Sequence, residues 1–235
     1  MHTYDVIVTM SQVGPDRLMR PHDLITIMQD CSNQWLQTEP AMLDYLRNNN
    51  MAMVVTSRQM DVLRYPAYDE RLQVRTSVFA CKGYLGYRNT CVYDEAGEPV
   101  ALSWSKGAWI DRATAKLQRV PAKIAESLVY DPEVPMEKLS KKVKVPECEP
   151  GRPEPWRVRP SHTDLYGHMN NAQYVRLAWD LLPEDFDVHR VRVEYKLQAR
   201  PGDLMVPALY RPDDGRCVVT LSAEDGTLFC PIEFE

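Results

Sequence analysis

The chain has 235 residues, of which 44% are hydrophobic and 26% charged, and its net charge is −5 at pH 7. This length fits one large domain or two of roughly 100 to 130 residues, and the composition is that of a globular protein. The acidic balance and the lack of a glycine-rich phosphate loop exclude general nucleic-acid binding and the common nucleotide-binding motifs. No stretch approaches the ~18 apolar residues of a membrane span, and MHTYDVIVTM lacks signal-peptide features, so we expect a cytoplasmic protein.

The cysteines are scattered, without a Cys-x-x-Cys pair or a histidine nearby. Zinc sites and dithiol redox motifs depend on such local groupings. We therefore expect neither a metal nor a redox cofactor. The cysteines are interpreted as small buried or half-buried hydrophobic residues, at positions Cys31, Cys81, Cys91, Cys148, Cys217 and Cys230.

The first half begins with a strand, TYDVIVTM, followed by a helix from about Pro21 to Gln37. Apolar residues recur at helical spacing in this helix, and Pro21 suits a first helical turn. A shorter helix over about 40–47 comes next. The strands MAMVVTSRQMDVLRY, RLQVRTSVFA, GYRNTCVYD and PVALSWSKGAWI follow, with DEAGE as the hairpin turn between the last two.

A proline-rich segment, 131–155, separates the halves. Proline density predicts an extended, semi-rigid linker. The segment also carries a local basic stripe. We favour the interpretation of the segment as a simple solvated connector, and a docking strip for an acidic partner is the alternative. The stripe consists of Lys138, Lys141, Lys142 and Lys144.

The second half repeats the order of elements in the first. It runs from the strand WRVRP to a helix over about Met169–Leu182, stopped by Pro183, and then to further strands. These are HRVRVEYKLQA, DLMVPALY, CVVTLSA and TLFCPIEFE, with RPDDG and AEDG as turns. The echo between RYPAYDERLQV and ARPGDLMV indicates an internal duplication. The predicted class is α+β, with one helix held by a curled antiparallel sheet, made twice.

The stretch SHTDLYGHMNNAQY crowds polar residues at the start of the second helix. Unpaired amides and the positive end of the helix dipole favour an anion there, so the amides of Gly167 and His168 are candidates for stabilising an oxyanion. Asp164 is a candidate general base or nucleophile, and the His168 side chain can polarise a carbonyl or orient water. Ordinary structural roles compete: Asp164 as a cap, and Asn170 and Asn171 as loop-holding amides.

The matching segment of the first half, VGPDRLMRPHDLITIMQ, has Asp16 and His22 but no Gly-His pair and no double Asn. Its spacing differs, and we interpret it as a decayed copy in which His22 is a polar residue of the first helical turn. The first helix is then expected to line a pocket without taking part in chemistry.

DLYGHMNNAQYV followed by VEYKLQARPGD resembles the hotdog-fold thioesterases, and the whole chain is similar to the acyl-ACP thioesterases. In the first half, VVTSRQMDVLRYPAYDE and SWSKGAWIDRATAKLQRVP carry this resemblance. It implies two tandem hotdog domains, each a curled antiparallel sheet around a central helix. The expected boundaries are a degenerate, acyl-binding domain over 1–130, a linker over 131–155 and a catalytic domain over 156–235.

The resemblance implies hydrolysis of fatty acyl-ACP to free fatty acid, with Asp164 and His168 as catalytic residues. The chain departs from the family at Tyr166, where Asn is expected, and at Gln198 and Ala199, where Glu and Cys are common. Loss of that Glu leaves the base or nucleophile role to Asp164, with Gln198 able to orient water. Tyr166 either donates a hydrogen bond or fills the pocket, and filling is preferred.

The implied partner is acyl carrier protein, whose acidic surface requires a basic counterpart. The lysine stripe, Arg152, Arg157 and Arg159 are candidates. The alkyl chain is expected to pass Trp35 and Met28, with the thioester between the halves. An acyl-CoA thioesterase and a non-catalytic acyl-thioester-binding hotdog protein stay open as alternatives, as do chain-length preference and pairing as a homodimer.

Overall fold

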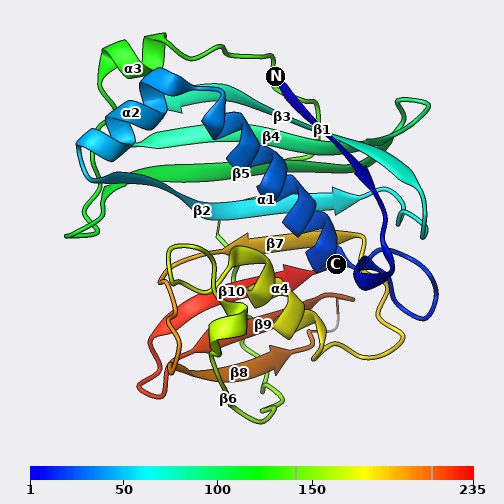
Figure 1. Ribbon diagram of the computed structural model, residues 1–235. Helices are drawn as coiled ribbons and strands as arrows, with labels where there is room; N and C mark the ends of the chain where they lie inside the picture. The colour runs from blue at the N-terminus through cyan, green and yellow to red at the C-terminus, as the bar shows by residue number, and fades with distance from the viewer. Residues whose placement is uncertain (141, 213) are drawn as a thin grey trace. The chain divides into compact units, whose positions relative to one another are not determined.

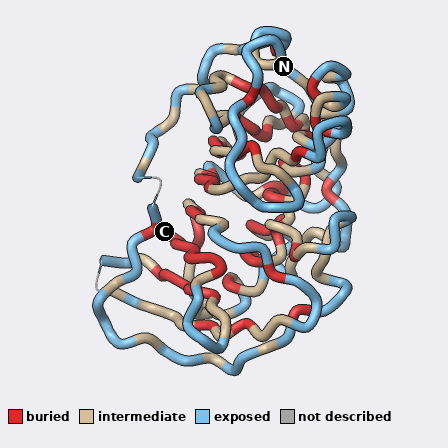
Figure 2. Tube along the Cα trace, turned by 90° about the vertical axis from the view of Figure 1, so that its left-hand side faces the viewer, coloured by how far each residue is buried: buried red, intermediate tan, exposed pale blue. Residues whose placement is uncertain are grey.

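The computed structural model describes residues 1–140, 142–212 and 214–235 and divides into two compact units, Met1–Lys138 and Leu139–Glu235 (Figure 1). The division falls inside the proline-rich segment that the sequence marks as a linker. Each unit pairs its strands antiparallel and places a helix against the sheet. In Figure 2 the buried stretches lie in the interior of each unit, and exposed stretches run around its outside.

In the first unit the strands are hydrogen-bonded in the order β1-β3-β4-β5-β2, and α1 lies across one face of this sheet (Figure 1). Its elements are β1 His2–Ile7, η1 Met10–Gln12, α1 Pro21–Gln37, α2 Pro40–Asn48, β2 Met51–Val62, β3 Arg71–Lys82, β4 Leu85–Asp94, β5 Pro99–Asp111 and α3 Ala122–Glu126. The predicted first helix, Pro21 to Gln37, is confirmed at both ends.

The second unit has the strand order β6-β8-β9-β10-β7, in which each strand takes the place of the corresponding strand of the first unit. Its helix α4 packs on β9 and β10. The elements are β6 Trp156–Arg157, η2 Pro160–His162, α4 Asn171–Trp179, β7 Arg190–Glu194, β8 Leu204–Tyr210, β9 Cys217–Ser222 and β10 Leu228–Phe234. The predicted RPDDG turn contains residue 213, which lies outside the described residues.

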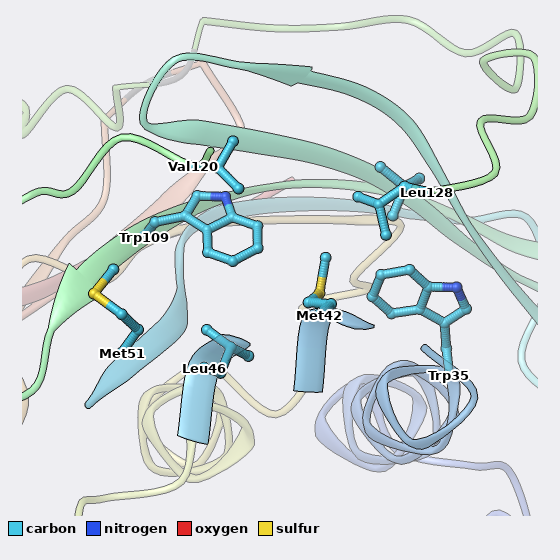
Figure 3. Packing of buried hydrophobic residues seen from close by; sticks show 8 residues of the cluster. Trp35, Met42, Leu46, Met51, Trp109, Val120 and Leu128 are labelled. Atoms are coloured by element: carbon cyan, nitrogen blue, oxygen red, sulfur yellow. The ribbon is translucent and has the colours of Figure 1, made fainter. Parts of the chain in front are cut away.

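A hydrophobic cluster joins the helices of the first unit to its sheet. Figure 3 shows side chains of α1, α2, β2 and β5 meeting those of two residues that follow β5 in the chain. Burial of each large apolar side chain contributes roughly 1.5–3 kcal/mol, so this cluster fixes α1 and α2 on the sheet. Its buried members are Trp35, Met42, Leu46, Met51, Val78, Trp109, Val120 and Leu128.

The proline-rich segment is largely exposed, as expected of a solvated connector, and it is also attached at several points along its length. Lys138 forms an ion pair with Glu133, and its ammonium lies 5.0 Å from the ring centre of Phe79. The backbone amide of Val134 donates to Asn89 Oδ1 at 3.0 Å. Further along the segment, Arg192 Nη2 donates to the Lys142 carbonyl at 3.1 Å. Of the predicted basic stripe, Lys138 is therefore engaged within its own unit, and Lys141 lies outside the described residues.

Two elements of the second unit are shorter than predicted. The helix spans Asn171–Trp179 instead of Met169–Leu182, because the Met169 amide donates to the Ala199 carbonyl at 2.8 Å and Asn170 caps the helix. The strand HRVRVEYKLQA leaves the sheet after Glu194. Beyond it, the amides of Lys196 and Leu197 still bond to the Phe229 carbonyl of β10, and Ala199 bonds to Met169 and to Tyr174 of α4.

No helix in the described part of the chain is long and apolar enough to cross a membrane. The cysteines are all free thiols; Cys31, Cys91, Cys217 and Cys230 are buried, Cys81 is half-buried, and Cys148 is exposed. Burial raises the pKa of the Cys31 thiol to about 11, so this group is protonated at neutral pH. The interpretation of the cysteines as small hydrophobic residues is confirmed for all but Cys148.

Candidate active site

The stretch before α4 forms a tight turn closed by backbone hydrogen bonds. The Asp164 amide donates to the His168 carbonyl at 2.8 Å, and the Gly167 amide donates to the Asp164 carbonyl at 3.0 Å. Gly167 has φ +74°, a left-handed conformation that glycine adopts without the usual Cβ penalty. Glycine therefore adopts this position of the turn without strain.

The carboxylate of Asp164 is held by this turn through one of its oxygens. Its Oδ1 accepts the Tyr166 amide at 2.8 Å and the His168 amide at 3.3 Å. The other oxygen, Oδ2, makes no hydrogen bond within the described part of the chain, and the residue is half-buried. Asp164 thus caps its own turn while one carboxylate oxygen stays open to a substrate or water.

The expected oxyanion donors at Gly167 and His168 are not free amides, because both already bond to Asp164. The start of α4 offers a different group. Three of the amides near this helix start have partners. The Asn170 amide donates to the His162 carbonyl, the Ala172 amide donates to Asn170 Oδ1, and the Gln173 amide donates to the Asn170 carbonyl. The Asn171 amide has none among the described residues, and the positive end of the α4 dipole adds to its pull on an anion.

The remaining predicted site residues lie around this turn with different degrees of engagement. The His168 side chain is half-buried and makes no hydrogen bond within the residues that the structure describes. The Tyr166 side chain is 58% exposed, which argues against its filling a pocket within this unit. Gln198 is also exposed, with its amide unbonded in the described part of the chain, and it precedes Ala199, which is attached to the turn.

Tyr174 connects α4 to the segment that ends at Ala199. It was not identified from the sequence as a site residue. Its hydroxyl accepts the Ala199 amide at 2.8 Å, while the Ala199 carbonyl accepts the Met169 amide at 2.8 Å. Burial raises the pKa of the Tyr174 hydroxyl well above its usual value, so it stays a neutral phenol. A tyrosine on the buried face of the predicted helix was the available signal, but its partner 25 residues away could not be read locally.

His162 borders the turn in a positively charged setting. The Arg159 amide donates to its Nδ1 at 3.2 Å, and its ring meets Trp156 edge to face with centroids 6.0 Å apart. Burial and then the charges of Arg176 and Arg159 lower the pKa of His162 below its ordinary value. The exposed arginines here give the site a basic rim.

The first unit contains the same turn. The Gly14 amide donates to the Leu18 carbonyl at 3.0 Å, the Arg17 amide donates to the Gly14 carbonyl at 2.9 Å, and Arg17 has φ 66°. Gly14, Arg17 and Leu18 therefore occupy the places of the acid, glycine and histidine of the second unit. The expectation of a different spacing is wrong: the spacing is conserved and the acid is missing.

Asp16 supplies a carboxylate to the first-unit turn from another position. Its Oδ1 accepts the Leu18 amide at 3.0 Å, as Asp164 Oδ1 accepts the His168 amide. A Cβ added to Gly14 would lie 2.9 Å from this same oxygen. His22 is buried in the first turn of α1, where its Nε2 lies 3.3 Å from Asp23 Oδ2, so it is a first-turn residue as predicted.

The chemistry available at the second-unit turn is that of a carboxylate, an imidazole and a helix-terminal amide. No group of three or more potential metal-ligating side chains gathers within the described ranges. The arrangement can activate water, or attack an electrophilic carbon, beside a donor for the negative charge that develops.

Family models match most of the chain. Residues 1–128 match the model of the acyl-ACP thioesterase N-terminal domain, and residues 148–211 match that of the acyl-ACP thioesterase C-terminal domain. No curated protein sequence gives a significant match.

Solved structures resemble the whole chain. An acyl-ACP thioesterase from Bacteroides thetaiotaomicron is 19% identical, with a TM-score of 0.89 over 99% of this chain and 96% of that one. A 12:0-ACP thioesterase from Umbellularia californica is 16% identical, with a TM-score of 0.88 over 99% of this chain and 95% of that one. At these identities the similarity establishes the fold, a largely antiparallel architecture with few helices that matches the hotdog-fold thioesterases.

Proposed function

Because the chain belongs to the acyl-ACP thioesterase family and hydrolyses fatty acyl-ACP, we propose that the turn at Asp164 and the first amide of α4 form its active site. The observation that carries this proposal is the half-held carboxylate, with Oδ1 bound by two amides and Oδ2 open. We also propose that the two units are tandem hotdog domains, with catalysis in the second. We further propose that the enzyme acts in fatty acid biosynthesis in the cytoplasm.

Asp164 is the base or the nucleophile in this proposal. As base, Oδ2 takes a proton from water while the water oxygen attacks the thioester carbon; the C–S bond then breaks, and the thiolate receives a proton. As nucleophile, Oδ2 attacks the same carbon, expels the thiolate and leaves a mixed anhydride that water hydrolyses. The two amides on Oδ1 fix the direction of Oδ2, which reduces the cost of orienting the group.

The carbonyl oxygen is placed at the Asn171 amide. This amide lacks a partner among the described residues, and it lies at the end of α4 where the dipole is positive. His168 polarises the carbonyl or orients water, since its imidazole makes no hydrogen bond in the described structure. The exposed Gln198 side chain helps to orient the attacking water, and the exposed Tyr166 side chain lies at the outer edge of the proposed site.

The first unit holds the alkyl chain in this proposal. Trp35 and Met28 of α1 are 4% and 0% exposed, so they offer apolar surface in the interior of this unit, where Arg88 and Arg58 also lie. The turn of this unit has glycine at the position of the catalytic acid, which supports a binding role without chemistry. Carrier protein would meet the basic rim of Arg157, Arg159 and Arg176 near His162.

The test is release of free fatty acid from acyl-ACPs of graded chain length by the wild type and by Asp164→Asn. Asn keeps an Oδ1 that can accept the two turn amides but loses the charged oxygen. A general base or nucleophile contributes roughly 100-fold to 10,000-fold, and kcat should fall by that amount with an unchanged melting curve.

Asp16→Asn is the matched control, because Asp16 makes the same kind of turn bond in the first unit. It should retain wild-type turnover. Running one acyl group on ACP and on CoA at two salt concentrations tests the carrier: only the ACP substrate should show a salt-sensitive KM. Turnover of Asp164→Asn at the wild-type rate across the panel would refute the assignment of the site.

A further inference from the structure

Two arginines lie inside the first unit, on the sheet face that α1 covers. Arg88 of β4 is paired with Ser105 of β5, and Ser105 is paired with Arg58 of β2. Directly paired residues of neighbouring strands point to the same face, so these three side chains form one row across the sheet. The Arg88 guanidinium lies 3.9 Å from the ring centre of Trp35, which places the row beneath α1 (Figure 1).

The groups bonded to Arg88 are neutral. Its Nη1 donates to Thr76 Oγ1 at 3.0 Å, and Thr76 Oγ1 lies 2.8 Å from Thr90 Oγ1. Ser32 of α1 completes this set, with its Oγ 3.3 Å from the Thr90 hydroxyl. A hydroxyl can accept from the guanidinium, but it brings no negative charge to balance it.

Arg88 keeps an unused donor in this interior. Arg88 is 8% exposed, its Nη2 is buried without a hydrogen-bond partner, and no carboxylate in the described part of the chain forms an ion pair with it. Burial and then the like charge of Arg58 lower the pKa of Arg88 to about 9, against the opposing effects of Cys31 and of the Glu39 carboxylate, which forms no ion pair with it; Arg88 is therefore still a cation at neutral pH. Buried charges in proteins are normally paired, which makes an unbalanced one a pointer to an absent anion.

An apolar environment adjoins this charge. Val78 is paired with Arg88 across the strands, and both Val78 and Trp35 belong to the hydrophobic cluster beneath α1 and α2 (Figure 3). The combination of a guanidinium and a hydrocarbon-like surface matches an aliphatic chain that ends in a carboxylate.

We propose that the interior of the first unit binds the carboxylate of an aliphatic chain through Arg88 Nη2, with Arg58 adding a second positive charge. This inference rests on the proposed acyl-binding role of the unit and deepens it. The carboxylate has two sources: the far end of a dicarboxylic acyl group attached to ACP by its other end, or a free fatty acid that enters head first. The first makes Arg88 a specificity residue, and the second makes it a site of product inhibition.

The first experiment measures calorimetric binding of dodecanoate and of dodecanol to the wild type and to Arg88→Met, which removes the charge but keeps an unbranched side chain. Removing a hydrogen bond to a charged group lowers the affinity about 10-fold to 100-fold. Dodecanoate should bind the wild type more tightly than dodecanol, and Arg88→Met should lose that difference. Arg75→Met is the matched control, because Arg75 also stacks on an aromatic ring, 4.2 Å from the Tyr93 centroid, outside this row.

The second experiment compares hydrolysis of dodecanoyl-ACP with that of the ACP half-thioester of dodecanedioic acid. A KM for the half-thioester that is about 10-fold lower, and that rises in Arg88→Met, identifies the substrate as the source. Arg88-dependent dodecanoate binding without this preference identifies the free acid. Dodecanoate binding needs no turnover, and dodecanoyl-ACP hydrolysis reports the active site separately, so failure of one proposal is distinguishable from failure of the other.

Should Arg88→Met fold poorly, Arg88→Lys and ligand-induced melting shifts of the wild type replace it. Equal shifts with dodecanoate and dodecanol would overturn the proposal. So would equal preferences in wild type and variants, or an Arg88→Met enzyme that simply accepts longer uncharged chains, because Arg88 would then be a plug and not an anion receptor.

Discussion

The proposed oxyanion donor can be removed by one substitution that the helix should tolerate. Asn171 is the first residue of α4, and its amide has no partner within the residues described. Asn171→Pro deletes this N–H and nothing else from the backbone hydrogen bonds. Proline is favoured at the first helical position, where its amide is not needed.

The structure supplies a precedent for the folded state of this variant. Pro21 starts α1 at the corresponding position of the first unit. The residue before it, Arg20, has φ −77° and ψ 153°, and Asn170 before Asn171 has φ −62° and ψ 138°. Both conformations are extended, as the residue before a proline requires. We expect a melting temperature close to that of the wild type.

The expected loss follows from the chemistry of the amide. Removal of one preorganised oxyanion donor typically costs roughly 100-fold to 1000-fold in kcat, or about 2.7–4 kcal/mol of transition-state stabilisation. Asn171→Ala keeps the amide and removes the side chain, and it should stay within about 10-fold of the wild type. The assay is single-turnover hydrolysis of an acyl-ACP, which isolates the chemical step from product release.

Two outcomes would contradict this reasoning. A folded Asn171→Pro enzyme with wild-type kcat would show that the Asn171 amide does not receive the oxyanion. Equal losses in Asn171→Pro and Asn171→Ala would assign the effect to the side chain, and the oxyanion donor would have to be sought elsewhere.

Three further predictions concern the surroundings of the site. Gly167→Ala should cost roughly 1–2 kcal/mol of stability because of its φ of +74°, while kcat falls less than about 10-fold, since its amide serves the turn. Tyr174→Phe should cost about 1–3 kcal/mol and lower kcat, because it leaves the buried Ala199 amide unsatisfied. Arg176→Met should raise the pKa of His162 toward its ordinary value without reaching it, because burial is the larger cause.

Each of these has a direct measurement. Thermal melts and hydrolysis rates test the first two substitutions; a 100-fold loss in a folded Gly167→Ala enzyme, or an unaltered Tyr174→Phe enzyme, would count against the geometry. NMR titration follows His162, and an unmoved pKa would contradict the effect of the Arg176 charge on it. The folded-state pKa lies below the unfolded value of roughly 6.5, so unfolding becomes easier as pH falls from that value toward the folded pKa.

Local sequence rules predicted the elements whose limits are set locally. The helix from Pro21 to Gln37 was predicted at both ends, because proline at its start and apolar spacing are short-range signals. Turns such as that at residues 94–98 follow the same logic: Gly97 has φ +82°, and Asp94 Oδ1 accepts the amides of residues 96 and 98.

The limits set by distant partners could not be predicted in this way. Asn170, Asn171 and Asp164 all suit a helix cap, and the selection of Asn170 depends on Met169 bonding to Ala199. The alternation of GYRNTCVYD predicts a strand, but not that its charged Arg88 faces the interior, since a period of two cannot distinguish one face from the other.

Comparison of the two units shows which polar residues before α4 are needed to close the turn and which are not. The first-unit turn closes with Asp16 as carboxylate and Arg17 in the left-handed position, so the turn alone requires neither an acid at its first residue nor a glycine at its fourth. Asp164 stands in place of Gly14 at that first residue, where its Oδ1 accepts two turn amides and its Oδ2 makes no hydrogen bond within the described residues. Since closure of the turn does not explain this placement, the proposed division into a catalytic and a binding unit depends on the position of the acid and not on the number of polar groups.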